Sequence, residues 1–295
     1  MTFMNYREPL FRPPAEAESL IFQIAYGCPH NGCRFCGMYK NVSYRVRPAE
    51  EVMREIREAA RMFPETARIF LADGDAMFLP FEILKQYLLT LNECFPRLAR
   101  VNLYANGSSI AGKTDSELGE LRRLKLHTLY VGLESGSSDI LNWFGKRESP
   151  ECMIGSVLRA QETGLKCSVM ILVGLGGRSR SENHLHETVR AVNRMQPNLL
   201  SALRFIPVPG LALPDGFLPV TEYEAVRELR DMVYGFVLKR TVFRANHSSN
   251  PVPLAGRFPQ DRLSLTAFLE HQLNSGTLDR TGPGSLPLFL WWTEL

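Results

Sequence analysis

The chain has 295 residues, of which 45% are hydrophobic and 22% are charged, and its formal net charge at pH 7 is +3. A chain of this length and composition can bury a full-sized core, which excludes a disordered or low-complexity protein. Acidic and basic residues are interspersed without long runs, so the sequence neither demands nor excludes a groove for nucleic acid.

Short apolar segments alternate with helical patterns along the chain, an order typical of βαβ units around a parallel sheet. Prolines, acidic first turns and capping threonines mark where the helices begin. We predict six strands, at residues 20–26, 67–72, 100–104, 127–133, 166–173 and 199–205. We predict helices at residues 48–63, 80–95, 115–124, 150–163, 181–195, 221–238 and 261–273.

Three of the six cysteines, Cys28, Cys33 and Cys36, lie in one loop directly after the first predicted strand. Their spacing is C-x4-C-x2-C, and three thiolates leave either a tetrahedral zinc or a four-iron cluster one ligand short. His30 can complete a zinc site, which keeps zinc as an alternative. We favour a [4Fe-4S] cluster whose fourth iron is open to a small molecule.

The other three cysteines, Cys94, Cys152 and Cys167, stand singly inside predicted helices or a strand. Helical and strand patterning buries such cysteines one at a time, where they behave as small apolar residues. We therefore predict that none of them is a metal ligand.

Polar and glycine-rich residues follow every predicted strand. Ligands gather at the carboxyl ends of strands in parallel α/β proteins, so these residues are candidates for a binding site. Each set alone has the composition of an ordinary turn, whereas six in register indicate a site. After the cysteine loop they are Asp73-Gly74-Asp75, Asn106 to Ser109, Glu134-Ser135-Gly136, Gly174 to Arg178, and Arg204 leading to Gly210.

With these motifs the chain resembles the radical S-adenosylmethionine (radical SAM) superfamily over about residues 20–210. The usual signature of that family is C-x3-C-x2-C with an aromatic residue before the last cysteine, here Phe35, and the first interval in this chain is one residue longer. The resemblance implies an α/β fold with a partial (β/α)6 TIM-like barrel at residues 20–210. An N-terminal extension at 1–19 and a C-terminal helical and loop extension at 211–295, which closes the barrel mouth, complete the expected domains.

The resemblance also implies cofactor contacts. Asp73, Gly74 and Asp75 stand where a Gly-Gly-Glu sequence commonly binds the methionine amino group of SAM, and Glu134 with Ser135 matches the position that holds the ribose hydroxyls. Further expected contacts are Phe35 and Val173 on the two sides of the adenine, Ser108 after the third strand, and Arg178 or Arg204 at the methionine carboxylate. For each of these two arginines, a surface or ion-pair role is the alternative to the carboxylate contact.

The implied cofactors are a [4Fe-4S] cluster and SAM. One electron from an external reductant of the flavodoxin or ferredoxin type then cleaves SAM to a 5′-deoxyadenosyl radical, which abstracts hydrogen from substrate. We expect a small metabolite or cofactor precursor as substrate rather than a tRNA or a peptide. Two other classes stay open: an iron-sulfur protein for electron transfer or redox sensing without SAM chemistry, and a zinc-stabilised binding module.

The chain changes character after residue 210, where prolines punctuate a loop and a polar segment lies at residues 243–251. Arg244, Asn246 and His247 in this segment are expected either to face the barrel mouth and contact substrate or to belong to an ordered loop capped by Asn and Ser side chains. We expect His184 and His186 to be solvated. The tryptophans at 291 and 292 are expected to cover the core or to contact another subunit.

No apolar stretch reaches the ~18 to 20 residues of a transmembrane helix, and residues 1–14 lack the pattern of a signal peptide. The sequence therefore predicts a cytoplasmic protein without a membrane partner. Clustered cysteines in that reducing compartment favour metal binding over disulfides.

Overall fold

The computed structural model describes residues 4–279 of the 295-residue chain, so the predicted tryptophan contacts at 291 and 292 lie outside the described residues. The chain divides into two compact units. Unit 1 consists of Met1–Asn31, Met38–Val131 and Gly155–Cys167, and unit 2 of Gly32–Gly37, Gly132–Ile154 and Ser168–Leu295. No helix between residues 4 and 279 is both long and apolar enough to cross a membrane.

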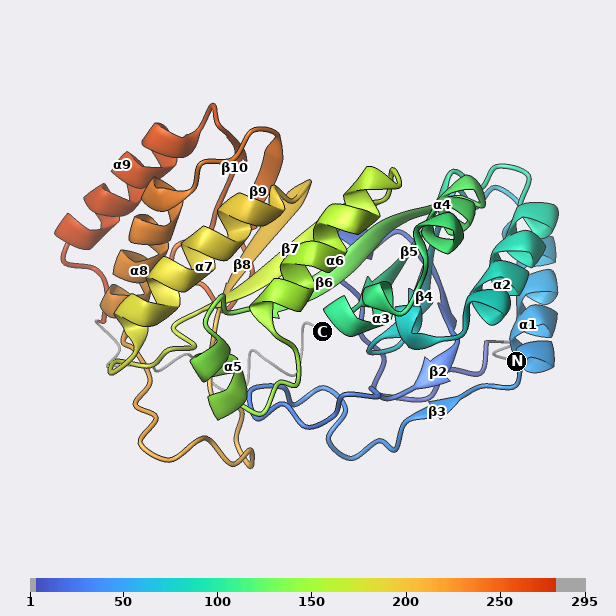
Figure 1. Ribbon diagram of the computed structural model, residues 1–295, viewed down its shortest axis with the longest axis horizontal. Coiled ribbons are helices and arrows are strands. Elements are labelled where there is room, and N and C mark those ends of the chain that lie inside the picture. Colours follow the sequence, from blue (N-terminus) through green and yellow to red (C-terminus); the bar gives the residue numbers. More distant parts are fainter. Residues whose placement is uncertain (1–3, 280–295) are drawn as a thin grey trace. The chain divides into compact units, whose positions relative to one another are not determined.

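Strands and helices alternate along most of the chain (Figure 1). The strands are β1 (Leu20–Gln23), β2 (Ala25–Tyr26), β3 (Arg45–Val46), β4 (Arg68–Ala72), β5 (Arg100–Ala105), β6 (Leu126–Glu134), β7 (Lys166–Val173), β8 (Leu199–Arg204), β9 (Thr241–Ala245) and β10 (Leu254–Phe258). The helices are α1 (Ala49–Met62), α2 (Phe81–Cys94), α3 (Gly107–Ala111), α4 (Asp115–Arg123), α5 (Ser138–Trp143), α6 (Pro150–Glu162), α7 (Ser181–Met195), α8 (Glu222–Gly235) and α9 (Arg262–Asn274). Short 3-10 turns lie at Pro14–Glu16 and Ala76–Phe78.

The sheet of unit 1 consists of parallel strands in the order β1-β4-β5-β6. β1 and β4 read as apolar runs, as expected for parallel strands covered on both faces, whereas β6 alternates buried and half-buried residues over much of its length. α1 covers part of it with Val52, Ile56 and Ala59, which recur every three to four residues and are fully buried. The parallel order brings the ends of β4 and β5 to the same edge as the start of the cysteine loop.

Residues before β1 are fastened to unit 1 by hydrogen bonds. The backbone amide of Arg7 donates to Gln23 Oε1 at 2.9 Å, and Gln23 Nε2 donates back to the Arg7 carbonyl at 3.0 Å. The buried Glu16 carboxylate accepts from Asn102 Nδ2 at 2.8 Å and from the Tyr130 hydroxyl at 2.5 Å. These partners satisfy a carboxylate that would otherwise be costly to bury.

The sheet of unit 2 has β7, β8 and β9 in parallel order, and β10 pairs antiparallel with β9. Phe243 of β9 packs edge-on against Phe258 of β10, which in turn packs on Phe236 at the end of α8. Side chains alternate along a strand, so Val242 and Arg244 lie on the opposite face of β9 from Phe243. α8 and α9 run side by side in this unit (Figure 1).

The predicted elements are present, and two of the differences concern strands that carry candidate residues. The predicted strand at 20–26 divides into β1 and β2. β1 pairs with β4, and the last hydrogen bond between them runs from the Ile24 amide to the Ala72 carbonyl. The chain then leaves β4, and β2 pairs with β3 instead. The predicted polar segment at 243–251 begins as a strand, since β9 adds a further parallel strand beside β8. Strand pairing there overrides a composition typical of loops.

Candidate functional site

The first cysteine of the loop contacts the turn that follows β4. Gly74 donates its backbone N–H to the Gly27 carbonyl at 3.2 Å. A Cβ added at Gly74 would lie 2.6 Å from Cys28 Cβ and 3.0 Å from Cys28 Cα, which is closer than carbon atoms approach one another. Only glycine therefore fits at residue 74 while Cys28 keeps this position.

The carboxylate of Asp73 is buried and held from two sides. Gln23 Nε2 donates to one oxygen at 2.7 Å, and the Tyr39 hydroxyl donates to the other at 2.9 Å. Burial raises the pKa of Asp73 to about 6, and the two side-chain hydrogen bonds oppose that rise. Asp73 thus ties the chain after the third cysteine to the ends of β1 and β4.

Asp75 is also saturated by partners within unit 1. Its carboxylate accepts from Ser109 Oγ at 2.9 Å and from Asn106 Nδ2 at 3.3 Å, and it lies 3.1 Å from His30 Nε2 of the cysteine loop. Ser108, the predicted contact after the third strand, is exposed at the start of α3, whereas its neighbour Ser109 is buried against Asp75. Asp75 is thus held by Ser109, from the predicted polar set after the third strand, and by His30, which the sequence offered as a zinc ligand.

The second and third cysteines lie in unit 2, in a turn closed by a bond from the Cys36 amide to the Cys33 carbonyl at 3.3 Å. The Arg34 amide donates to the Phe144 carbonyl at 2.7 Å, and the Phe35 ring packs against the Phe144 ring with centroids 6.0 Å apart. The turn between the two cysteines is therefore fixed on the residue that follows α5.

Glu134, predicted to hold the ribose hydroxyls, ends β6 in a left-handed conformation with φ of +63°. A non-glycine residue in that region is uncommon and is found where the surrounding structure imposes it. Its side chain folds back over Gly132, because a Cβ at Gly132 would lie 2.0 Å from Glu134 Oε1. The carboxylate is buried at 7% exposure.

Lys146 is the cation beside this carboxylate, and the sequence did not reveal it. Lys146 Nζ donates to the Gly132 carbonyl at 2.6 Å and lies 3.5 Å from Glu134 Oε1 and 5.9 Å from the centre of the Phe35 ring. Burial raises the pKa of Glu134, and the charge and hydrogen bond of Lys146 lower it. Glu134, Lys146 and Phe35 thus form one group in unit 2.

Ser135 rests on a buried histidine, which corrects the prediction that His184 is solvated. His184 is fully buried, Ser135 Oγ lies 2.8 Å from its Nδ1, and its Nε2 donates to the Leu172 carbonyl at 3.0 Å. Burial lowers the pKa of His184, so the imidazole is neutral. His186, on the same helix, is exposed as predicted.

The two predicted arginines both contact the segment that begins α8. Arg178 Nε donates to Glu224 at 2.8 Å on the surface. Arg204 is buried on the face of β8 that also carries Ala202, its Nη2 donates to the Val220 carbonyl at 3.3 Å, and burial lowers its pKa. Val173, the predicted adenine contact, is buried and pairs in register with Arg204. This geometry favours the ion-pair and structural alternative for both arginines.

The predicted substrate residues follow or belong to β9. Arg244 is exposed on the strand and donates to the Phe243 carbonyl at 3.0 Å, and Asn246 is exposed just after it. His247 Nδ1 lies 2.8 Å from Ser249 Oγ and accepts from the Ser249 amide at 3.1 Å. This turn is ordered by its own polar side chains, as one of the two alternatives predicted, and it follows the carboxyl end of a parallel strand.

The cysteines differ in exposure. Cys28, Cys33 and Cys36 are half-buried, and so are Cys94 and Cys152, which corrects the prediction that all three remaining cysteines are buried. Only Cys167 among the six is buried, and burial raises its pKa to about 12, which disfavours the thiolate. Within residues 4–279 no three His, Cys, Asp or Glu side chains are already gathered around a metal position. Each of the three half-buried thiols of the loop has the donor chemistry and access that a ligand of an iron-sulfur cluster requires.

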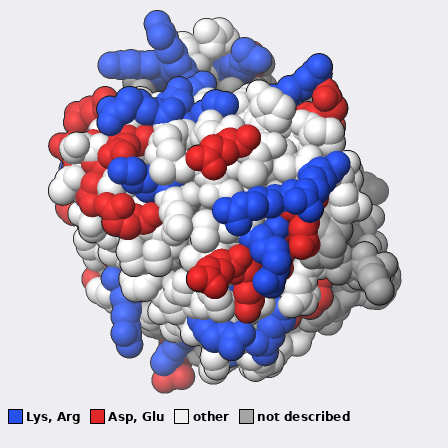
Figure 2. Space-filling model, turned by 90° about the vertical axis from the view of Figure 1, so that its right-hand side faces the viewer, with Lys and Arg blue, Asp and Glu red and all other residues white. Residues whose placement is uncertain are grey.

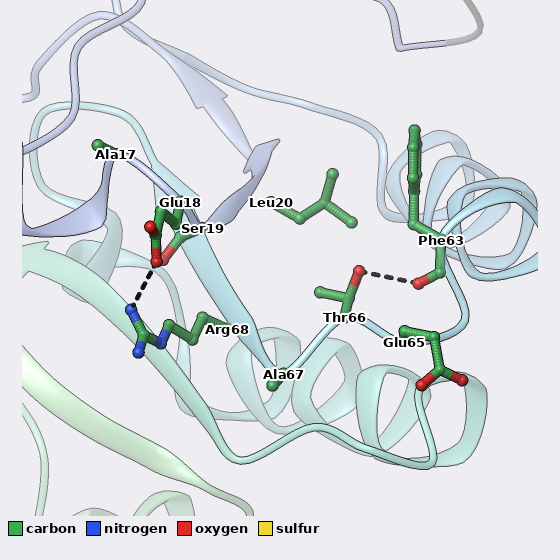
Figure 3. A pocket seen from close by; sticks show the side chains of 9 residues that line it. All are labelled: Ala17, Glu18, Ser19, Leu20, Phe63, Glu65, Thr66, Ala67 and Arg68. Carbon is green, nitrogen blue, oxygen red and sulfur yellow. Dashed lines mark hydrogen bonds and ion pairs between the residues drawn. The ribbon is translucent and has the colours of Figure 1, made fainter.

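A hollow of about 540 Å³ opens at the opposite edge of the unit 1 sheet, at the amino ends of β1 and β4 (Figure 3). Its polar groups are paired: Arg68 bonds to Glu18 at 3.3 Å, and the Thr66 hydroxyl donates to the Phe63 carbonyl at 2.8 Å. Ligands of parallel α/β proteins gather at the carboxyl ends instead. We assign no ligand to this hollow.

Known proteins share this arrangement of strands. A family model described as the radical SAM superfamily matches residues 22–190, more than half of the chain. The chain is similar to coproporphyrinogen III oxidase (HemN) from Escherichia coli, a radical SAM enzyme, with 17% identity and a TM-score of 0.54 over 87% of this chain and 52% of that one. It is also similar to methylornithine synthase (PylB), with 14% identity and a TM-score of 0.52 over 86% of this chain and 81% of that one.

A third similar structure is HydG, a maturase of the [FeFe]-hydrogenase, with 17% identity and a TM-score of 0.49 over 73% of this chain. The chain spans 48% of the length of HydG. No curated protein sequence matches it. The likenesses to HemN and PylB show the fold and confirm the predicted α/β class with mostly parallel strands.

Proposed function

The chain belongs to the radical SAM superfamily, and we propose that it is an enzyme that binds a [4Fe-4S] cluster through Cys28, Cys33 and Cys36 and starts radical chemistry with SAM. The observation that carries the proposal is the contact of Gly74 with Cys28. Glycine is the one residue that fits there, so the turn after β4 is shaped around the first cysteine of the loop. Such close backbone approach is typical of a ligand-binding edge.

The residues of unit 1 hold the start of the loop rigid. The Asp73 carboxylate accepts hydrogen bonds from Gln23 and Tyr39. The Asp75 carboxylate contacts His30, Ser109 and Asn106. Backbone groups of the Asp73-Gly74-Asp75 turn are therefore the better candidates for contacts to the methionine part of SAM than the two carboxylates. In this chain the aspartates preorganise the turn instead.

Glu134 is the residue we assign to the ribose hydroxyls. Two hydroxyl donors would satisfy a carboxylate that is now buried beside a single cation, Lys146. Lys146 lowers the pKa of Glu134 against the larger rise caused by burial, and so favours the ionised form that accepts both bonds. Ser135, supported by His184, fixes the turn that carries Glu134.

When bound, the cluster and SAM supply one-electron cleavage of the bond from sulfur to C5′ and a 5′-deoxyadenosyl radical. The chain excludes water from that chemistry with apolar side chains around Phe35. The Phe35 ring packs on an aromatic cluster of unit 2, which consists of Trp143, Phe144, Phe205 and Phe217. An external one-electron reductant of the flavodoxin or ferredoxin type remains the proposed partner.

For the substrate, we propose a small molecule contacted by Arg244, Asn246 and His247. Arg244 lies on the face of β9 that is turned away from Phe258 and α8, and the turn of Asn246 and His247 follows the carboxyl end of that strand. On the face of the molecule in Figure 2, basic and acidic side chains are intermixed rather than gathered by sign.

Anaerobic reconstitution tests the proposed function. We expect a brown protein with about four iron and four sulfide per chain, and formation of 5′-deoxyadenosine from SAM after reduction with dithionite. A colourless protein with one zinc would indicate the zinc-stabilised binding module. A brown protein that does not bind SAM in anaerobic equilibrium dialysis would indicate an electron-transfer or redox-sensing protein.

A further inference from the structure

The loop that follows β7 depends on a side chain far along the sequence. Gly174 leaves the strand with φ of +82° and Gly177 has φ of +58°, and the Gly177 amide donates to the Gly174 carbonyl at 3.0 Å to close the turn. The Gly174 amide points out of this turn and donates to Glu228 Oε1 of α8 at 2.6 Å. Glu228 therefore bonds to the residue at which the chain leaves β7.

Glu228 is a buried carboxylate with few other partners. Its exposure is 3%, and its second oxygen accepts from the Ser181 hydroxyl at 2.5 Å. His184 Nε2 lies 3.6 Å away and donates to the Leu172 carbonyl instead, so the neutral imidazole does not balance the charge. The Gly174 amide and the Ser181 hydroxyl are thus the two charge-assisted bonds that stabilise it.

The segment before α8 presses on the same loop. A Cβ at Gly174 would lie 2.5 Å from Val220 Cγ2, and one at Gly177 would lie 2.8 Å from the Leu218 carbonyl oxygen. The Arg178 amide donates to that carbonyl at 3.0 Å. All these contacts come from residues after 190, where the match to the family model ends.

We propose that Glu228 is a positioning residue for SAM: it holds the backbone of residues 174–177 in the conformation that lines the adenine. The inference rests on the proposed function, in which this loop contacts the cofactor. The affinity for SAM would therefore depend on a residue of α8, in the C-terminal part of the chain. A loop without this carboxylate would have an unpaired buried amide at Gly174 and would open to water.

The test uses the full chain with its cluster reconstituted anaerobically. Glu228→Ala removes both bonds, Glu228→Gln keeps an acceptor for the Gly174 amide, and Arg227→Ala truncates an exposed side chain at the preceding position of the same helix. Hydrogen exchange of the peptide covering 174–180, iron content and the SAM dissociation constant are measured on each. Ser181→Ala, which removes one donor at a half-buried position, is measured alongside in case Glu228→Ala does not fold.

We expect Glu228→Ala to keep its iron, to exchange faster at 174–180 and to bind SAM about tenfold more weakly. Glu228→Gln should restore most of the affinity, Ser181→Ala should weaken it by about threefold, and Arg227→Ala should match wild type. Undiminished SAM affinity in both Glu228→Ala and Ser181→Ala overturns the inference alone. Wild-type protein that keeps its iron and binds no SAM overturns the proposed function, and the inference falls with it.

Discussion

The turn after β4 and the end of β6 each bury a carboxylate, and the two are satisfied in opposite ways. Asp73 has two neutral donors, Gln23 and Tyr39, on its two oxygens. Glu134 has one cation, Lys146, at 3.5 Å, and its backbone adopts the left-handed region. Burial raises the pKa of both carboxyls, but only at Asp73 do side-chain hydrogen bonds from neutral groups offset it.

Asp73 therefore holds a turn in place, whereas Glu134 can still accept hydrogen bonds from a ligand. A carboxylate whose oxygens are already bonded contributes rigidity to a turn and has little capacity left for a ligand. A buried carboxylate with one neighbouring cation retains lone pairs for further donors, and backbone strain at such a position is typical of functional sites. Variants that break each region should therefore fail differently, the turn after β4 through loss of the cluster and the end of β6 through loss of SAM affinity.

The largest effect is expected from the cysteines themselves. Cys28→Ala, Cys33→Ala or Cys36→Ala should abolish iron binding, because three thiolates are the minimum for a cluster with one open iron. Iron content and visible absorption after anaerobic reconstitution measure this. The triple variant of Cys94, Cys152 and Cys167 to Ala is the control and should retain its iron. Full iron in Cys33→Ala would contradict the ligand assignment.

The next largest effect tests the contact between the turn and the loop. Gly74→Ala places a methyl group 2.6 Å from Cys28 Cβ, so we expect a stability loss of about 1–3 kcal/mol together with lower iron content. Gly155→Ala in α6 is the matched control, because nothing lies within 4 Å of its added methyl group. That control should gain up to about 1 kcal/mol from helix propensity. Equal urea midpoints and iron contents for the two variants would remove Gly74 from the site.

The end of β6 should respond in SAM affinity alone. Glu134→Gln should weaken SAM binding by roughly 1–3 kcal/mol, the scale of a hydrogen bond to a charged group, with iron content unchanged. Lys146→Met should act in the same direction, and the double variant should cost less than the sum, because the two side chains act as a pair. Equilibrium dialysis with labelled SAM measures each constant.

Lys85→Met is the matched control for Lys146→Met, since Lys85 pairs with Glu120 at 2.8 Å where both side chains are one-third exposed. It should leave SAM binding unchanged. If Glu134→Gln binds SAM as wild type does, the carboxylate is only the structural partner of Lys146.

Periodicity predicted most of the fold because most elements bury a regular apolar stripe. α1 and β7 show this directly, with boundaries close to the predicted ones. It missed α3 and α5, which have 5 and 6 residues and are too short to show a helical period. It also missed β9, whose Arg244 lies on an exposed face and makes the strand read as a polar loop.

The sequence could predict those parts of the candidate site in which a residue stands at the end of a strand. It could not predict contacts between residues that are far apart in the sequence. Cys28, Gly74 and Glu134 stand out locally as residues at strand ends. Lys146 follows Glu134 only after a short helix, and its burial beside that carboxylate is a tertiary property. Asp75 stands out locally as a residue at a strand end, but no local pattern shows its contact with His30, 45 residues earlier.

The smallest effect concerns the support beneath the end of β6. His184 is buried and neutral, and burial lowers its pKa in the folded state, so protons bind more tightly to the unfolded chain. Stability contributed by this group is thus present above the unfolded pKa of about 6.5 and is lost as pH falls below it, with a slope of at most about 1.4 kcal/mol per pH unit. Exchanging the exposed His186 for Ala should leave that slope intact, whereas His184→Asn should flatten it between pH 6.5 and 5. Urea unfolding across this range measures both variants, and an unchanged slope in His184→Asn would show that burial of His184 is not the source of the pH dependence.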